Sequence, residues 1–203
     1  MVSEPKLISS LVWLAIVAVP SVGATEPWAH LANRHGMELE RRAVAGSELA
    51  EVRVSTHTDL SAAAVAAATW ADRFDGKLTK KIRLHWEIVS ETQSERVQYV
   101  QVRVPVVRNR DYTLRLRRSF DEHGVFHLET EAIPERPPQP GFVRIPHARG
   151  IWTVTPTADG GCDVVYVAWA EPGGMVPAFV IRSAQVDSAL DLVQEVLDWA
   201  RTH

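Results

Sequence analysis

The sequence predicts an α+β fold in which a curved antiparallel sheet wraps around one long C-terminal helix, with an apolar cavity between them. Segments with alternating apolar and polar residues extend from residue 82 to residue 170, tight-turn sequences separate several of them, and one long amphipathic segment closes the chain. Alternation buries one face of a sheet, and an amphipathic helix buries one stripe. The helix is therefore expected to pack on the inner face of the sheet.

The strands come in two groups. The first group is preceded by residues 26–33, predicted to form a short helix, and its two strands, 37–43 and 49–57, are joined by a turn at Gly46-Ser47. The second group contains six strands, at residues 82–88, 97–104, 112–120, 125–132, 142–154 and 163–170. Gly150 is expected to mark a bend or bulge in the long strand 142–154.

Two further helices are predicted. Asp59 or Ser61 can cap an alanine-rich helix that continues to about Trp70, and its small side chains would let it lie close to a neighbour. The closing helix covers residues 176–201 and carries a stripe of small and apolar residues at three- and four-residue steps. This stripe is predicted to form the roof of the cavity.

Composition limits the classes of function. The 203 residues suffice for one sizeable domain, and the net charge of -3 gives no electrostatic basis for binding nucleic acid. Cys162 is the only cysteine, which excludes an intramolecular disulfide and a cysteine-based structural metal site. The eight histidines have no metal-ligand spacing, so neither a metal nor a cofactor is expected.

The N-terminal segment is typical of a secretory signal peptide. Lys6 provides a positive charge, residues 11–19 are apolar, and small residues at Val22-Gly23-Ala24 precede a cleavage site after Ala24. The apolar run is too short to span a bilayer as a helix. The chain is therefore divided into a signal peptide at 1–24 and one domain at 25–203, exported to the periplasm or secreted.

Several short motifs occur in an order that is informative as a set. They are Val97-Gln98-Tyr99, Arg110-Asp111-Tyr112, Val143-Arg144, Gly150-Ile151-Trp152, Glu171-Pro172-Gly173-Gly174 and Val176-Pro177. Through them the chain resembles the START family, the StAR-related lipid-transfer domains, over nearly all of residues 25–203. The resemblance implies a helix-grip fold, a hydrophobic tunnel for one lipid or sterol, and usually no catalysis.

The alternation predicts which side chains line the tunnel. In strand 112–120 the apolar side chains share one face and Arg115 and Arg117 share the other, and a buried arginine needs a partner, so the arginine face is predicted to be in water. The side chains predicted to face inward and bind the ligand are Trp86, Val97, Tyr99, Gln101, Tyr112, Leu114, Leu116, Trp152 and Phe179. Each of them could equally be part of an ordinary packed core.

One departure from the family matters for the ligand. Some sterol-binding members bury an acid and an arginine on two adjacent strands, and register from Arg110-Asp111 places these positions at Val97 and Leu116. Neither residue is charged. The resemblance therefore gives no support for cholesterol recognition by such a pair and implies a more apolar tunnel.

Three classes of function remain. The first is a noncatalytic protein that binds, and could transfer, a lipid, a sterol-like molecule or another hydrophobic ligand, with transient membrane contact and no nucleic-acid partner. The second is an enzyme on a related scaffold, such as a polyketide cyclase or aromatase, which would need acid–base groups inside the cavity. The third is a protein-interaction module with a filled core. The cavity separates these classes. A carrier should have a roomy, apolar cavity, an enzyme should have a cavity with polar, titratable groups, and an interaction module should have no cavity.

Overall fold

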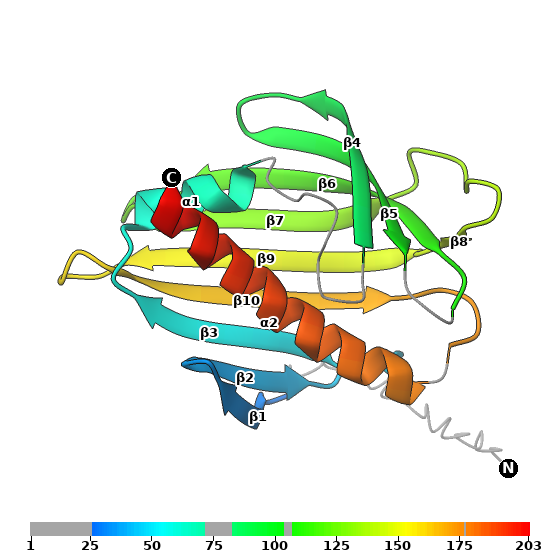
Figure 1. The fold of residues 1–203 in the computed structure, drawn as a ribbon, viewed down its shortest axis with the longest axis horizontal. Helices are drawn as coiled ribbons and strands as arrows, with labels where there is room; N and C mark the ends of the chain where they lie inside the picture. Colours follow the sequence, from blue (N-terminus) through cyan, green and yellow to red (C-terminus); the bar gives the residue numbers. More distant parts are fainter. Residues whose placement is uncertain (1–25, 72–82, 104–106, 177) are drawn as a thin grey trace, which may run out of the picture.

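A ten-stranded sheet forms the body of the protein. The computed structural model describes residues 26–71, 83–103, 107–176 and 178–203. The strands of the sheet follow the order β1-β2-β3-β10-β9-β7-β6-β5-β4, and every neighbouring pair along this path is antiparallel (Figure 1). Their bounds are β1 Ala29–Arg34, β2 Met37–Arg42, β3 Glu51–Thr58, β4 Arg83–Glu91, β5 Glu95–Arg103, β6 Arg110–Phe120, β7 Phe126–Ile133, β8 Val143–Arg144, β9 His147–Pro156 and β10 Cys162–Glu171.

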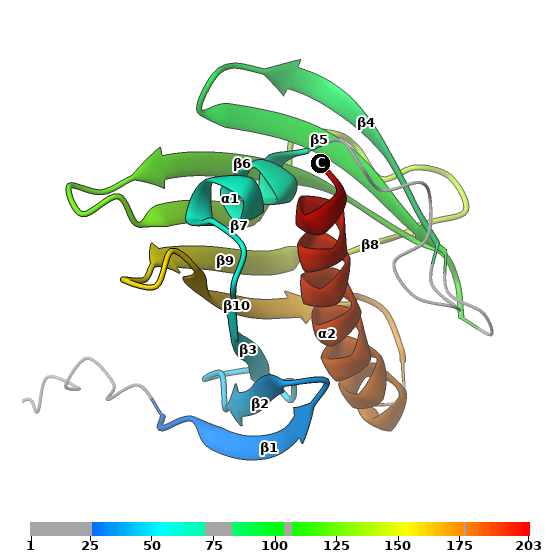
Figure 2. The ribbon, with the colours of Figure 1, turned by 60° about the vertical axis from the view of Figure 1, so that its left-hand side comes forward.

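Two helices lie on one side of this sheet. Helix α2 (Ala178–Thr202) crosses the strands obliquely, and Figure 2 shows the sheet curving around it. Helix α1 (Ala62–Trp70) begins at Ser61, whose hydroxyl accepts a hydrogen bond from the Ala64 amide at 3.2 Å. Of the two predicted caps, Ser61 is the one used. Both predicted helices are thus confirmed, and α1 packs against α2 and against strands β7 and β9.

The hydrophobic core lies between the sheet and α2. Val54, Val154 and Val164 on the sheet are fully buried with Val193 and Val196 on the helix. These valines follow the strand and helix periods predicted from the sequence. The expected architecture, a curved antiparallel sheet gripping a C-terminal helix, is confirmed.

The prediction of a helix at residues 26–33 is wrong. Ala29–Arg34 is strand β1, which pairs with β2 through a two-residue turn at His35-Gly36, both with positive φ (54° and 76°). This turn geometry matches the twist of a hairpin, and glycine at its second position is the usual signal for it. The helix propensity of the alanine and leucine in β1 is overridden by pairing with β2.

The predicted strand 142–154 is two strands. Pro146 lacks the N–H that the sheet would need, and the chain breaks there into β8, which pairs in parallel with β6, and β9. Gly150 forms no bulge, since its pairing with Ala168 and Thr130 is in register. A Cβ at Gly150 would lie 2.7 Å from Thr130 Oγ1, so glycine is required by close packing.

Candidate functional site

A cavity of about 360 Å³ lies between the inner face of the sheet and helix α2. Strands β4, β5, β6, β7, β9 and β10 contribute alternate side chains to it, and α2 contributes residues from successive turns. The volume is within the range of about 300–1,000 Å³ typical of small-molecule sites. The apolar side chains in its lining include Leu84, Trp86, Val100, Leu114, Leu116, Leu128, Trp152, Ile181 and Leu192.

Five of the predicted inward residues line this cavity. They are Trp86, Tyr112, Leu114, Leu116 and Trp152. The three from β6 occupy its inner face because side chains alternate along a strand. The Trp152 ring stacks on Tyr166 of the neighbouring strand, with 4.5 Å between the ring centroids. The side chain of Phe179 lies outside the described side chains, although its backbone is in α2.

The predicted direction of Val97, Tyr99 and Gln101 is wrong. Val100 lies opposite Tyr112, and Gln98 opposite Leu114. Directly opposed residues of an antiparallel pair point to the same face, so Gln98 and Val100 face the cavity and their neighbours face away. Both faces of β5 are buried, which removes the polar–apolar alternation that would have revealed the register.

The pairing of β5 with β6 places a charged residue opposite Leu116. Its cross-strand partner is Arg96, and Val97 lies opposite Arg115. The Arg96 guanidinium is buried against the Trp70 ring at 4.6 Å, and it donates to Glu91 with 2.6 Å from Nη2 to Oε1. Val97 and Leu116, the two positions considered in the sequence, are both uncharged. Arg96 is neutralised by Glu91 and is not part of the cavity lining.

The Arg-Asp motif at the start of β6 has its charged partners on the outer face. Asp111 is fully buried and accepts four hydrogen bonds. The donors are Arg144 Nε (3.0 Å) and Nη2 (3.0 Å), the backbone N–H of Gln139 (3.1 Å) and the Tyr99 hydroxyl (2.9 Å). Burial by itself would raise the pKa of Asp111, but these donors and the charge of Arg144 together hold it below its ordinary value. The motif fastens the loop 134–141 and β8 to the sheet.

The polar groups in the cavity wall are uncharged hydroxyls, amides and indole N–H groups, with one exception. Burial raises the pKa of Tyr112 to about 12 and also raises the pKa of Tyr166, so both phenols are protonated at neutral pH. The exception is Arg149, which already pairs with Glu51 at 3.0 Å. Among the lining residues that the structure describes there is neither a carboxylate nor a histidine.

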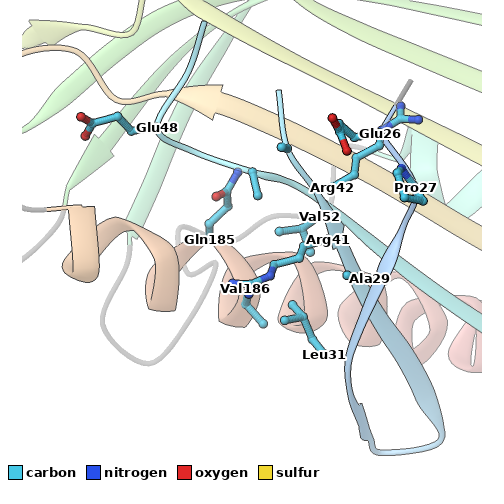
Figure 3. A pocket seen from close by; sticks show the side chains of 12 residues that line it. Glu26, Pro27, Ala29, Leu31, Arg41, Arg42, Glu48, Val52, Gln185 and Val186 are labelled. Atoms are coloured by element: carbon cyan, nitrogen blue, oxygen red, sulfur yellow. The ribbon is translucent and has the colours of Figure 1, made fainter. Parts of the chain in front are cut away.

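A second pocket of about 360 Å³ lies between the β1–β2 hairpin, the start of β3 and the side of α2 (Figure 3). Leu31, Val52 and Val186 give it an apolar part, while Glu26, Arg41 and Glu48 give it charges. Its wall is built from a hairpin at the edge of the sheet. The main cavity, in contrast, is lined by six strands and by α2, which makes it the stronger candidate for an enclosed apolar ligand.

The residues that the structure describes contain neither a metal-binding cluster nor a membrane-spanning helix. No cluster of three or more histidine, cysteine, aspartate or glutamate side chains suited to a metal ion was found in that part of the chain. No helix there is long and apolar enough to cross a membrane. Cys162 is buried and unpaired, and burial raises the pKa of its thiol to about 11.

The fold and the cavity define a helix-grip protein with a mainly apolar site of about 360 Å³, and comparison with known proteins gives the family. The START domain model matches residues 24–201, and the chain belongs to the START domain family. An uncharacterized protein of Pseudomonas aeruginosa is 23% identical over 185 residues, covering 89% of this chain and 90% of that one. The phosphatidylcholine transfer protein of Bos taurus is 26% identical over 113 residues, which is 53% of each chain.

Solved structures agree on the fold. A STAR-related lipid transfer protein fragment from Xanthomonas axonopodis superposes with a TM-score of 0.76 and 27% identity, covering 86% of this chain and 98% of that fragment. Human StAR-related lipid transfer protein 5 gives a TM-score of 0.72 with 17% identity and covers 86% of both chains. Binding of lipids or other hydrophobic ligands is the function that this family supports.

Proposed function

We propose that this protein binds one hydrophobic small molecule in the cavity between the sheet and α2 and carries it without changing it chemically. The observation that supports this most directly is the cavity itself, about 360 Å³ of space walled mainly by apolar side chains. Burial of a ligand's apolar surface contributes roughly 25 cal/mol per Å² before the cost of ordering. A lipid-like molecule can therefore bind there without a salt bridge.

The composition of the wall favours a carrier over a cyclase or aromatase. General acid–base chemistry needs groups that exchange protons near neutral pH. The described lining supplies tyrosines whose pKa values are raised by burial and an arginine engaged by Glu51, and it supplies no carboxylate or imidazole. An interaction module with a filled core would not need such a cavity.

The proposal extends to location and transfer. The pattern at residues 1–24, which lies outside the described residues, supports export and a mature start at Thr25. A ligand insoluble in water must be collected from a membrane or another carrier, so the cycle includes transient membrane contact. The names of two relatives, a phosphatidylcholine transfer protein and a STAR-related lipid transfer protein, are consistent with a transfer role.

One purification tests these points together. The full chain, expressed in a bacterium able to export it, is recovered from periplasm or medium and analysed by intact-mass and lipid mass spectrometry. The expected result is a chain beginning at Thr25 with a stoichiometric hydrophobic molecule that is unchanged after incubation. Retention of Met1 in the cytoplasmic fraction would overturn export, and conversion of the ligand to a product would overturn the carrier role.

A further inference from the structure

Gln185 stands where the two pockets meet. It is the one described residue that lines both of them. Its neighbours on α2 line different spaces: Ala184 and Ser188 line the main cavity, and Val186 lines the second pocket. Figure 3 shows Gln185 and Val186 extending from α2 toward the chain around Val52. The Gln185 side chain therefore forms part of the wall between two spaces of similar volume.

The amide of Gln185 is one of two donors in the cavity lining that are buried without a described partner, and the other is Trp169 Nε1. The Nε2 of Gln185 is buried, and no described group accepts a hydrogen bond from it. A buried amide without a partner costs free energy, and a leucine of similar size would separate the pockets without that cost. An N–H donor is completed only by an acceptor oxygen or nitrogen. A ligand in the adjoining cavity is the natural source of that acceptor.

The charge of the wall restricts the ligand further. Arg149 is the one charged side chain in the described lining, and it is already held by Glu51 at 3.0 Å. A carboxylate or phosphate would thus find no free counter-charge among these residues. The other polar groups in the described lining are uncharged, and they include the hydroxyls of Tyr112 and Tyr166 and the amide of Gln98.

From these contacts we infer that Gln185 is the specificity-determining residue of the main cavity. Its amide donates a hydrogen bond to an uncharged oxygen of the ligand, and its side chain stops the ligand at the wall of the second pocket. The ligand class is a compact, uncharged, lipid-like molecule that carries a carbonyl, ester or hydroxyl oxygen. This inference rests on the proposed function, since it assigns the ligand of the same cavity.

Displacement of Nile red by a matched pair of probes, 2-tridecanone and tridecane, tests the hydrogen bond. The two probes have the same number of carbons and differ in one oxygen. The wild-type chain should bind the ketone about tenfold more tightly, the ratio expected for about 1.4 kcal/mol from one hydrogen bond. In Gln185→Leu the ratio should fall to about one. Gln194→Leu is the matched control on the same helix, because the Gln194 amide donates to Asp198 on the surface and should leave the ratio unchanged.

A longer ketone, 2-nonadecanone, tests whether the Gln185 side chain separates the two pockets. Gln185→Ala should join the two pockets and improve binding of this probe several-fold relative to 2-tridecanone, with circular dichroism confirming the fold. Three results would each overturn the inference and leave the carrier role intact. The wild type could bind ketone and alkane equally, or Gln185→Leu could keep the ketone preference. The third result is that Gln185→Ala gains no affinity for the longer probe. Failure of the wild type to bind Nile red or either probe would overturn the carrier role and the inference with it.

Discussion

The two faces of strand β6 differ in how their polar side chains are hydrogen-bonded. Asp111 points to the outer face, is fully buried, and accepts four hydrogen bonds from three residues. Tyr112, the next residue, points into the cavity, and no hydrogen bond to its hydroxyl is found among the described residues. The outer face carries the ion-pair and hydrogen-bond network around Asp111, although Thr113 Oγ1 and Arg115 Nε on that face have no described hydrogen-bond partner, while the inner face lines the cavity.

Other residues repeat this contrast. On the outer face Glu51 accepts from Arg42 at 2.6 Å and from Arg149 at 3.0 Å, and Arg115 pairs with Glu131 at 3.2 Å. On the inner side Gln185 keeps a buried amide without a partner. We therefore expect the ion pairs of the outer face to contribute mainly to stability and the cavity side chains mainly to binding. The two faces should therefore respond differently to substitution.

The largest effect on stability is expected for Asp111→Asn. The change leaves the Arg144 guanidinium without its carboxylate and should lower the free energy of unfolding by about 3 kcal/mol, as expected when one member of a buried ion pair is removed. Urea denaturation measures this. Affinity of the folded fraction for a fluorescent fatty-acid analogue should stay unchanged, because Asp111 is not part of the cavity wall. A destabilisation below about 1 kcal/mol would contradict the assigned role of the network.

The stability that the Asp111 carboxylate contributes should depend on pH. The pKa of Asp111 is lowered in the folded protein from an ordinary value of 3.8. A group with a depressed folded pKa contributes stability that is complete above the unfolded pKa and is lost as pH falls toward the folded pKa. Urea midpoints between pH 6 and pH 3 should therefore fall more steeply below about pH 4 for the wild type than for Asp111→Asn. Parallel curves would show that the outer network does not depend on this charge.

A smaller effect is expected for Tyr99→Phe. The substitution removes the hydroxyl that donates to Asp111 at 2.9 Å and should cost about 1 kcal/mol of stability. Since Tyr99 faces away from the cavity, ligand affinity should not change. Isothermal titration and thermal denaturation of the same samples separate the two quantities. A loss of affinity without a loss of stability would restore the inward orientation of Tyr99.

The smallest effect is expected for Arg115→Gln on the exposed part of the outer face. The Arg115–Glu131 pair is partly open to water, and such pairs contribute about 1 kcal/mol or less. Urea denaturation at low salt should register a small loss that shrinks further in high salt, because salt screens exposed charges. An effect as large as that of Asp111→Asn would mean that the outer face behaves as one coupled network.

The sequence predicted the inner face of β6 and failed on β5 for a definite reason. In β6 arginines alternate with apolar residues, so the wet face is marked by charge. In β5 Val97 and Tyr99 are as buried as Val100, because the loop 134–141 and the Asp111 network cover the outer face. That cover depends on contacts across more than twenty residues of sequence, such as Asp111 with Gln139 and Arg144, which local periodicity does not contain.

Strand β1 and the position of Gln185 both depend on long-range packing that the local sequence does not show. Local helix propensity at residues 26–33 was overruled by pairing with β2, although His35-Gly36 was an available hairpin signal. Gln185 lies beside the predicted apolar stripe of α2, and its position between two pockets follows only from how α2 crosses the sheet. Periodicity assigns faces, whereas long-range packing decides what covers each face.

The central claim, that the inner face of the sheet is a binding surface and the outer face is structural, is tested most directly by one tryptophan on each face of β6. Leu114→Trp should fill the cavity and reduce affinity for a fluorescent fatty-acid analogue more than tenfold, a change of about 1.4 kcal/mol or more. Arg117→Trp, on the exposed face of the same strand, should bind like the wild type. Normal binding by a folded Leu114→Trp chain, or equal loss in both variants, would contradict the account.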